Sequence, residues 1–343
     1  MSVARPGAGS GRWALLAILA GAVVLLLFQR WLGPYKGYGS ASIVISIPKG
    51  SSPGDVAARL TDAGVVRSSR GLRWLARLRG VSGSLKAGEY EFRGEIAPGA
   101  VLDRLVEGDV LLHRLTIPEG LSGPEVIRRV AALALAPAAD LEKAYNDPSP
   151  VRDIDGGAEN LEGYLFPDTY RFARGTSAGR IMEEMVDGFK RAFGPPLRRL
   201  AVERGMSVRQ VVTLASLIEK ETSVPVERAR VSSVFHNRLR LGMALQCDPT
   251  VIYALATDGK YNGSLTRDDL EYASPYNTYL NAGLPPGPIA SPGAAALRAA
   301  VEPAETLDLY FVADGSGGHT FSTSLADHLQ AVTRYRQIRK SRA

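Results

Sequence analysis

The stretch that most constrains this fold is residues 207–221, SVRQVVTLASLIEKE, because it predicts a helix with one strongly apolar face. Ser207 with Gln210 three residues later is the pattern of a capping box, which predicts where the helix begins. At about 100° per residue the apolar face consists of Val208, Val211, Val212, Ala215 and Ile218, and the opposite face of Arg209, Thr213, Ser216 and Lys220. Such a helix needs a second layer over its apolar face, so we expect the chain to fold around it.

Two carboxylates lie at the end of this predicted helix. Glu219 is in line with the apolar face, and Glu221 lies on the opposite border, over Leu214 and Leu217. A carboxylate held against apolar side chains loses hydration and its pKa rises, which is how a glutamic acid becomes a proton donor near neutral pH. The alternative is that Glu219 only closes the helix, and the helical wheel by itself favours this structural interpretation.

Composition narrows the classes of function. A chain of 343 residues with 45% apolar and 22% charged residues is typical of a globular protein with two or three domains. The net charge of +6 is spread along the chain, and no basic run is interleaved with aromatic residues, so we expect no nucleic-acid partner. With one cysteine, Cys247, and four scattered histidines, the sequence predicts no intrachain disulfide, no metal site and no cofactor.

The N-terminus predicts a membrane anchor. Residues 13–28 form an unbroken apolar run, and counting on to Leu32 reaches the roughly 20 residues that a helix needs to cross a bilayer. Trp13 and Trp31 lie where interfacial aromatic residues are expected. We favour an uncleaved anchor over a cleaved signal peptide, because the run is long and no small-x-small cleavage site follows it. The predicted order is a cytoplasmic tail (1–12), a transmembrane anchor (13–32) and a linker (33–42), with all later residues on the other side of the membrane.

A short sequence motif occurs twice. Ile47-Pro-Lys-Gly-Ser-Ser52 is repeated as Ile117-Pro-Glu-Gly-Leu-Ser122, and each copy predicts a strand end, a glycine turn, a serine cap and an amphipathic helix. The alternative is chance recurrence of a common strand-to-helix connection. The first copy lies in a predicted strand, helix, helix and strand (43–47, 53–64, 69–79 and 88–92), which resembles a LysM-type glycan-binding module.

Further downstream the sequence predicts helices and loops around the stretch at 207–221. The predicted helices are 177–193, 196–204, 225–239, 249–256 capped by Asp248, a short one from Ser291-Pro292, and 325–340; a hairpin pairs 309–312 with 319–322. The aromatic stretch 161–170 suits sugar stacking and a plain core equally well. The tyrosine-rich loop 272–280 and the proline-rich loop 283–293 are more typical of a binding rim than of a linker.

The sequence lacks the residue motifs of other classes of enzyme. The sequence contains neither a G-x-S-x-G elbow nor a phosphate loop of the G-x-x-x-x-G-K-[ST] form, and Cys247 lacks the basic neighbours of a nucleophile. What is left is one carboxylate on an apolar helix, bordered by loops rich in Tyr, Asn and Pro. This pattern favours a sugar-cleaving site that uses a proton donor.

The ordered set of motifs resembles the YceG-like endolytic murein transglycosylases over roughly Ile43 to Arg336. The matching motifs are Leu161 to Tyr170, Leu-Ile-Glu219-Lys-Glu-Thr222, Glu227-Arg228, Val234-Phe-His-Asn-Arg-Leu239, Met243 to Thr250, Tyr276-Asn-Thr-Tyr279, Gly283-Leu-Pro-Pro-Gly287, Tyr310-Phe-Val-Ala-Asp-Gly315 and His319-Thr-Phe321. The resemblance implies an α+β protein with a single N-terminal transmembrane helix, a small LysM-like α+β subdomain (43–112) and a larger mixed α/β catalytic domain (113–343). It also implies the bacterial inner membrane, a periplasmic catalytic domain, peptidoglycan glycan strands as substrate, and peptidoglycan synthases as partners.

The resemblance assigns the catalytic acid to Glu219. In the implied reaction this residue protonates the glycosidic oxygen between N-acetylmuramic acid and N-acetylglucosamine, and the sugar's own C6 hydroxyl then closes a 1,6-anhydro ring. The candidate substrate-binding residues are Glu221, Asn237, Gln246, Asp248, Tyr276, Asn277, Thr278 and His319. Two alternatives remain at this point: a muramidase-type hydrolase in which Glu221 or Asp248 activates water, and a non-catalytic glycan-binding scaffold.

Overall fold

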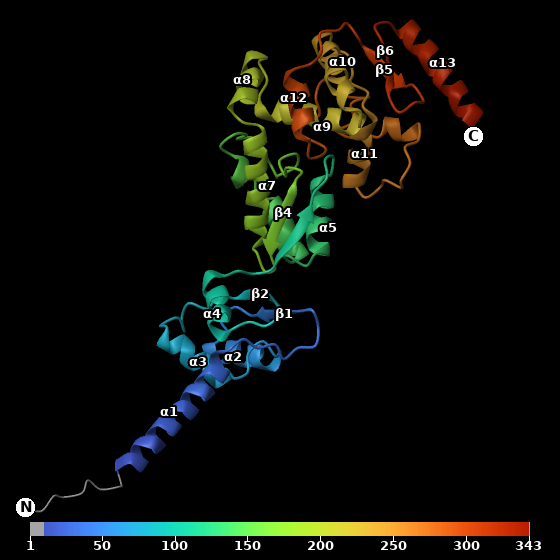
Figure 1. The fold of residues 1–343 in the computed structure, drawn as a ribbon. Helices are drawn as coiled ribbons and strands as arrows, with labels where there is room; N and C mark the ends of the chain where they lie inside the picture. Colours follow the sequence, from blue (N-terminus) through green and yellow to red (C-terminus); the bar gives the residue numbers. More distant parts are fainter. Residues whose placement is uncertain (1–9, 343) are drawn as a thin grey trace, which may run out of the picture. The chain divides into compact units, whose positions relative to one another are not determined.

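The computed structural model describes residues 10–342, without the side chains of residues 10–12, 24–28 and 342. The chain divides into two compact units (Figure 1). Unit 1 is the described chain up to His113 together with Ala173–Gly175, and unit 2 is the remainder. Most of the predicted cytoplasmic tail (1–12) lies outside the described residues. Each unit has a hydrophobic core of its own.

Unit 1 contains one antiparallel strand pair with helices packed on it. Its elements are α1 (Ser10–Leu32), β1 (Ser42–Ile47), α2 (Pro53–Asp62), α3 (Ser69–Leu78), β2 (Gly88–Arg93), α4 (Pro98–Glu107) and the start of β3 (Leu112–Thr116). The register pairs Ser42 with Arg93 and Ile47 with Gly88, which places Ile45 and Ile47 on the same buried face as Tyr90 and Phe92. Apolar residues of α2, α3 and α4 close over this face and make a separate core.

Helix α1 covers the segment in which we predicted a membrane anchor. Among the described residues, however, no helix combines the length and the apolar character that a membrane crossing requires. The prediction for residues 13–32 is therefore not confirmed, and part of that segment, 24–28, lies outside the residues whose side chains are described.

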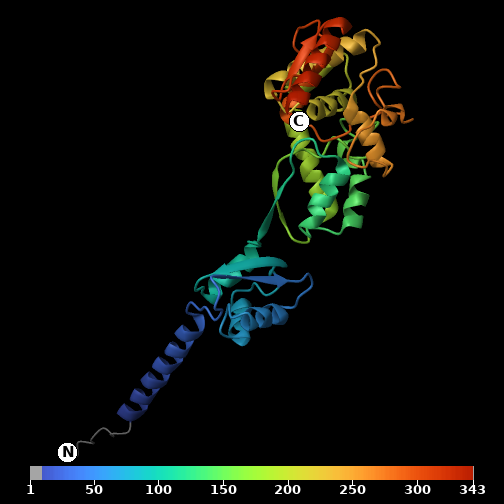
Figure 2. The same cartoon turned by 90° about the vertical axis from the view of Figure 1, so that its right-hand side faces the viewer.

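Unit 2 is built around α9 (Val208–Glu221), which is the helix predicted from residues 207–221. The other elements of unit 2 are the rest of β3, α5 (Gly123–Ala132), α6 (Ala138–Tyr145), η1 (Ser149–Val151), β4 (Thr169–Ala173), α7 (Ala178–Ala192), α8 (Pro195–Glu203), η2 (Pro225–Glu227), α10 (Arg228–Arg240), α11 (Asp248–Thr257), η3 (Asp268–Glu271), α12 (Ala294–Val301), β5 (Tyr310–Ala313), β6 (His319–Ser322) and α13 (Leu325–Arg342). Helices α8, α10, α11 and α12 contact α9 (Figure 1). Helix α13 packs on the β5–β6 hairpin, drawn red in Figure 2.

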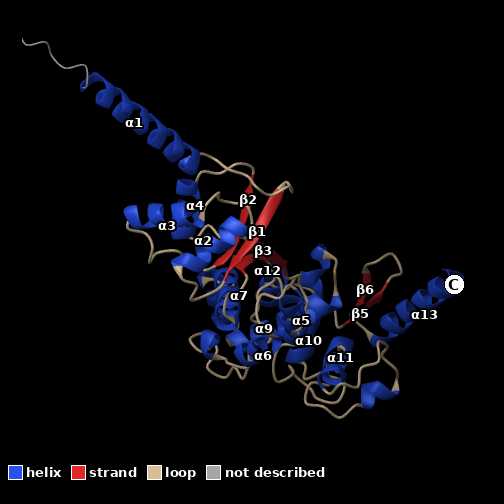
Figure 3. Cartoon of the chain, turned by 90° about the horizontal axis from the view of Figure 1, so that it is seen from below, coloured by secondary structure: helices blue, strands red, loops and turns tan. Residues whose placement is uncertain are grey.

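Strands are short throughout the described chain, where they form three separate two-stranded sheets, β1–β2, β3–β4 and β5–β6 (Figure 3). Helices supply most of the ordered backbone in both units. The protein is therefore a mixed α+β fold, as predicted, with its larger core made by helix packing rather than by a central sheet.

Three local predictions need correction. Thr213 and Ser216, predicted on the polar face of α9, are buried, because helices contact α9 on all sides. Asp248 does not cap α11: Cys247 is the N-cap, without a side-chain hydrogen bond, and Asp248 is already helical. Helix α12 begins at Ala294 after Gly293, rather than at Ser291-Pro292.

The repeated motif folds as predicted in both copies. Gly50 and Gly120 adopt φ values of +81° and +78°, which a residue with a side chain adopts only with strain. Ser52 donates its backbone N–H to Asp55 Oδ2 at 3.0 Å, and Ser122 donates its own to Glu125 at 2.8 Å. The two turns therefore share one backbone conformation, although they lie in different units.

Candidate active site

Glu219 lies in the last turn of α9 with its side chain only 6% exposed. Its Oε2 accepts the backbone N–H of Gly293 at 3.0 Å, and its Oε1 lies 3.4 Å from Nη2 of Arg228. Gly293 precedes α12 and Arg228 begins α10, so two elements that pack on α9 supply the partners of one carboxylate. A buried carboxyl held at both oxygens has a fixed orientation, which a proton donor requires.

Arg228 joins Glu219 to a second carboxylate. Its Nη2 lies 3.6 Å from Oε2 of Glu119, which belongs to the second copy of the repeated turn and is 48% exposed. Burial raises the pKa of Glu119 above its usual value, the charge of Glu219 raises it further, and Arg228 partly offsets both effects. Nε of Arg228 is buried and has no hydrogen-bond partner in the described protein. The guanidinium therefore has unused hydrogen-bonding capacity beside the two carboxylates.

Gly293 lets the chain approach this cluster closely. A Cβ placed on Gly293 would lie 1.8 Å from Oε1 of Glu119, so any larger residue would push that carboxylate away. At Gly120 a Cβ would lie 3.8 Å from Cγ of Glu219, an ordinary van der Waals distance. Gly120 donates its N–H to the carbonyl of Ser291 at 2.9 Å, which ties the turn to the loop before α12.

The proline-rich loop 283–293 forms hydrogen bonds with α9 at three positions along the helix. Arg209 donates to the carbonyl of Pro286 at 2.9 Å, Ser216 Oγ accepts the N–H of Ile289 at 3.1 Å, and Glu219 accepts that of Gly293. The spacing of these contacts follows α9 from its first turn to its last. The loop is therefore a fixed wall of the site, and its contact with Ser216 explains why that serine is buried.

A second acidic cluster lies just beyond the end of α9. Burial is the main reason why the pKa of Glu221 rises to about 7; the charge of Asp248 raises it as well, and a hydrogen bond with the thiol of Cys247 opposes the rise. Asp248 accepts a hydrogen bond from the hydroxyl of Tyr279. Glu221 and Asp248, two of the predicted site residues, are thus electrostatically coupled to each other.

A cavity of about 260 Å³ is lined by neighbours of Glu219, although Glu219 itself is not among its lining residues. The lining includes Gly120, where a Cβ would lie 3.8 Å from Cγ of Glu219, and Lys220, the next residue along the chain, together with Ile252, Tyr253 and Tyr261. Aromatic and apolar faces next to a lysine suit a ligand with both apolar ring faces and hydroxyl groups.

Three predicted binding residues have buried side chains. Nδ2 of Asn237 donates to the carbonyls of Thr306 and Asp308, both at 2.9 Å, and Nδ2 of Asn277 donates to those of Leu270 and Tyr272 at the same distance. Thr278 Oγ1 accepts the N–H of Cys247 at 3.0 Å. These three side chains hold loops in place. That they also contact substrate stays a prediction.

The remaining predicted residues lie in different places within unit 2. The ring of Tyr276 contacts that of Tyr253, a residue lining the cavity, with centroids 5.0 Å apart and the planes tilted by 49°. Gln246 is exposed and has a φ of +50°. His319 is held by Glu227, with Nδ1 2.7 Å from Oε2. Tyr276 is the one of these three whose contacts place it close to the cavity.

Sequence reasoning placed Arg228, Glu119 and Glu162 in motifs but assigned none of them a role in the site. Glu162 is 4% exposed, and burial raises its pKa to about 7. Its oxygens accept the N–H of Gly123 at 3.0 Å and the hydroxyl of Tyr145 at 3.0 Å, so it completes the N-terminus of α5. The available signal for Glu119 was the second copy of the repeated motif, where an acid replaces Lys49. Among the residues that the structure describes, no group of three or more His, Cys, Asp or Glu side chains could hold a metal ion.

An oriented, buried glutamate whose neighbours Gly120 and Lys220 line a cavity is an arrangement that suits an enzyme with a carboxylic acid as proton donor. The sequence model of the YceG-like family matches residues 45–334, and the chain belongs to this family. It is 32% identical over 337 residues to the endolytic murein transglycosylase of Bacillus subtilis (strain 168), covering 93% of this chain and 91% of that protein.

Two further relatives agree with this assignment. The endolytic murein transglycosylase of Streptococcus pneumoniae (serotype 2, strain D39) is 30% identical over 88% of this chain and 60% of that longer protein. The crystal structure of a putative YceG-like protein from Listeria monocytogenes matches with a TM-score of 0.58 at 35% identity, over 84% of this chain and 98% of that chain. The relatives thus span both units.

Proposed function

We propose that this protein is an endolytic murein transglycosylase and that Glu219 is its catalytic acid. The observation that carries the proposal is the geometry of Glu219: a carboxyl that is 6% exposed, held by Gly293 and Arg228, on the central helix of a YceG-like chain. The names of the curated relatives support the same activity. The substrate class is the peptidoglycan glycan strand, cut internally.

The proposed reaction needs one carboxyl group and no water. Protonated Glu219 gives its proton to the glycosidic oxygen between N-acetylmuramic acid and N-acetylglucosamine, and the bond from C1 to that oxygen breaks. The C6 hydroxyl of the same muramic acid attacks C1 of the oxocarbenium-like intermediate and loses its proton to the Glu219 carboxylate. The products are a free 4-hydroxyl on N-acetylglucosamine and a 1,6-anhydro end, and the acid is regenerated.

Arg228 fits this reaction. The Arg228 guanidinium, with its unpaired Nε, can stabilise the carboxylate that forms when the proton leaves. A hydrolase would need a second group to activate water. Glu221 lies in the separate cluster with Cys247 and Asp248, and we propose a structural rather than a catalytic role for it.

The test compares Glu219→Gln with wild type on uncrosslinked glycan strands, with product ends identified by mass spectrometry. We expect 1,6-anhydro ends from wild type and a loss of about a thousandfold in rate for the variant, since general acid catalysis contributes roughly 10²–10⁴-fold. Glu203→Gln, an exposed acid on α8, is the matched control and should keep full activity. Reducing ends from wild type would establish a hydrolase, and equal rates for Glu219→Gln would remove Glu219 from the chemistry.

We further propose that α1 anchors the chain in the bacterial plasma membrane, with the residues from about Gly33 onward on the periplasmic side beside the peptidoglycan synthases. Helix α1 carries exposed apolar side chains, among them Trp13, Ile18 and Leu19, which is unusual on a surface that faces water. The strand, helix, helix and strand order of β1, α2, α3 and β2 supports a LysM-like assignment for 43–112. Fractionation after alkaline carbonate washing tests the anchor: release of the full chain into the wash would contradict it.

A further inference from the structure

Helix α3 has one face that the proposed chemistry does not use. At about 100° per residue, Arg70, Arg73, Trp74 and Arg77 fall within a single arc of the helix, and all four are exposed. The opposite face carries Leu72, Leu75 and Ala76, which are buried in the core of unit 1. The fold of unit 1 therefore fixes α3 in an orientation that presents three guanidinium groups and an indole outward.

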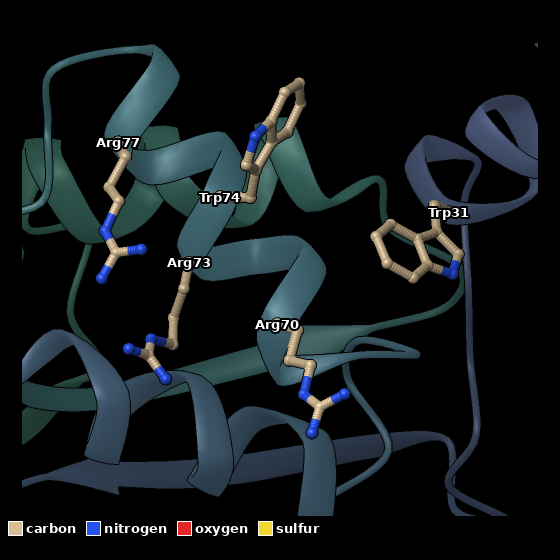
Figure 4. A pocket seen from close by; sticks show the side chains of 5 residues that line it. All are labelled: Trp31, Arg70, Arg73, Trp74 and Arg77. Carbon is tan, nitrogen blue, oxygen red and sulfur yellow. The ribbon is translucent and has the colours of Figure 1, made fainter.

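A second tryptophan completes this surface. Trp31, in the last turn of α1, is 50% exposed and reaches toward α3, and a Cβ on Gly71 would touch its ring at 3.4 Å (Figure 4). Trp31, Trp74 and the three arginines together line a cavity of about 470 Å³, which we call the α1–α3 groove. Figure 4 shows the three arginines projecting from successive turns of α3, with Trp31 facing the helix.

The positive charge of the groove is not neutralised by the protein. Among the described residues, none of Arg70, Arg73 and Arg77 makes an ion pair or a hydrogen bond, and α3 itself contains no acid. Ion pairs elsewhere in unit 1 use other arginines, such as Arg79 with Asp103 at 2.9 Å. Three uncompensated guanidinium groups in one groove attract an anion with several oxygen acceptors.

We propose that the α1–α3 groove binds the phosphate headgroups of anionic phospholipids and thereby docks α3 on the membrane surface. Two observations identify a lipid rather than a free anion. The groove has indole walls, which favour the boundary between headgroup and acyl chain. One of these walls, Trp31, belongs to the apolar helix α1, so the groove lies at the end of the proposed anchor. The proposal rests on that anchor only for bringing the groove to the bilayer.

The chain offers a clean probe, because its three tryptophans are Trp13, Trp31 and Trp74. Full-length Trp13→Phe protein, which retains the two groove tryptophans Trp31 and Trp74, is reconstituted into nanodiscs of phosphatidylcholine or of phosphatidylcholine with phosphatidylglycerol. Quenching of these two tryptophans by acrylamide reports their exposure to water. We expect phosphatidylglycerol to lower the quenching constant at least about twofold, an effect that high salt reverses because it is electrostatic.

The arginines are tested in the same background. Arg70→Gln/Arg73→Gln/Arg77→Gln should abolish the difference between the two lipids, since each arginine near an anionic surface changes the docked-to-free ratio by about fivefold. Arg152→Gln/Arg171→Gln/Arg336→Gln removes the same charge from exposed sites in unit 2 and should keep the effect. Equal quenching in both lipids, or a triple α3 variant that behaves like the parent, would overturn the proposal.

Two further experiments distinguish a failure of the proposed anchor from a failure of the proposed lipid site. If the chain does not co-elute with nanodiscs, the anchor has failed, and the groove is then tested with added phosphatidylglycerol vesicles, which should still protect the two groove tryptophans. Inorganic phosphate is added to the protein without lipid; protection equal to that given by vesicles would assign the groove to a free anion and contradict a lipid site.

Discussion

The two copies of the Ile-Pro-x-Gly-x-Ser turn have the same backbone but different surroundings. In unit 1, residues 47–52 carry Lys49 at the variable position, and a Cβ on Gly50 would meet no atom within 4 Å. In unit 2, residues 117–122 carry Glu119, which faces Glu219 across Arg228. The same strand-to-helix turn is thus an exposed connection in unit 1 and part of the candidate active site in unit 2.

The comparison extends to the first residue of the following helix. Pro53 occupies this position after the first turn and has no N–H to satisfy. Gly123 occupies it after the second turn, and its N–H is bound by the buried carboxyl of Glu162. A local motif therefore specifies the backbone, while the residues brought to it from other parts of the chain decide whether it carries chemistry.

The largest expected contrast is in stability, between Gly123→Ala and Gly54→Ala. A Cβ on Gly123 would lie 2.1 Å from the ring of Tyr145, which is buried and bonded to Glu162, so we expect a loss of about 3 kcal/mol in the free energy of unfolding. Gly54 has only Ser52 Oγ at 3.4 Å, and alanine there should be neutral or stabilising by up to about 1 kcal/mol. Denaturant unfolding measures both, and equal effects would contradict the contrast.

Glu162 makes the second turn dependent on pH. Because burial raises its folded-state pKa from 4.5 to about 7, the protonated form stabilises the fold below about pH 4.5, and this contribution is lost as pH rises through 7. Glu162→Gln removes the titration. The stability difference between wild type and variant should therefore shift in favour of the variant, by on the order of 3 kcal/mol, between pH 4.5 and 8. Parallel stability curves would show that Glu162 does not titrate in this range.

Glu119→Gln tests the shared arginine. Without the second carboxylate, Arg228 is free to pair with Glu219 alone, which favours the ionised form of the acid. We therefore expect about a tenfold fall in kcat together with a basic limb of the pH–rate profile displaced to lower pH. Lys49→Gln, at the corresponding position of the first turn, should leave kcat unchanged. An unaltered rate and profile for Glu119→Gln would show that the bridge is only structural.

The smallest expected effect is the one that the two turns share. Ser52→Ala and Ser122→Ala should each cost about 1 kcal/mol of local helix stability, because both serines belong to capping boxes. Hydrogen exchange of the first amides of α2 and α5 measures the two losses separately. A loss confined to one helix would mean that the two copies are not equivalent.

Local sequence predicted those parts of the fold that depend on neighbouring residues. The start of α9 at Ser207, both repeated turns and the β5–β6 hairpin follow from caps, glycines and alternation within a few residues. The helical wheel also placed Glu219 where an acid becomes buried.

Contacts between distant parts of the chain could not be predicted in the same way. Periodicity placed Thr213 and Ser216 on the face opposite the apolar one, but α12, α10, α11 and α8 contact their helix and both side chains are buried. Glu119, Arg228 and Gly293 come from three separate segments. The packing of α10 and α12 on α9 brings Arg228 and Gly293 to Glu219, and the hydrogen bond from Gly120 to Ser291 ties the turn that carries Glu119 to the same place. The amides of Asn237 and Asn277 are polar side chains that hold loops, which composition cannot distinguish from ligand contacts.

The hydrogen bond from Gly293 to Glu219 has a spectroscopic consequence. An amide proton that a carboxylate accepts resonates downfield, and the resonance moves when the acceptor is protonated or turned toward a ligand. The ¹⁵N–¹H signal of Gly293 is therefore a built-in NMR reporter of the charge and orientation of Glu219. Followed by titration or during addition of glycan fragments in ¹⁵N-enriched protein, it would track the acid directly, without an attached probe and without turnover.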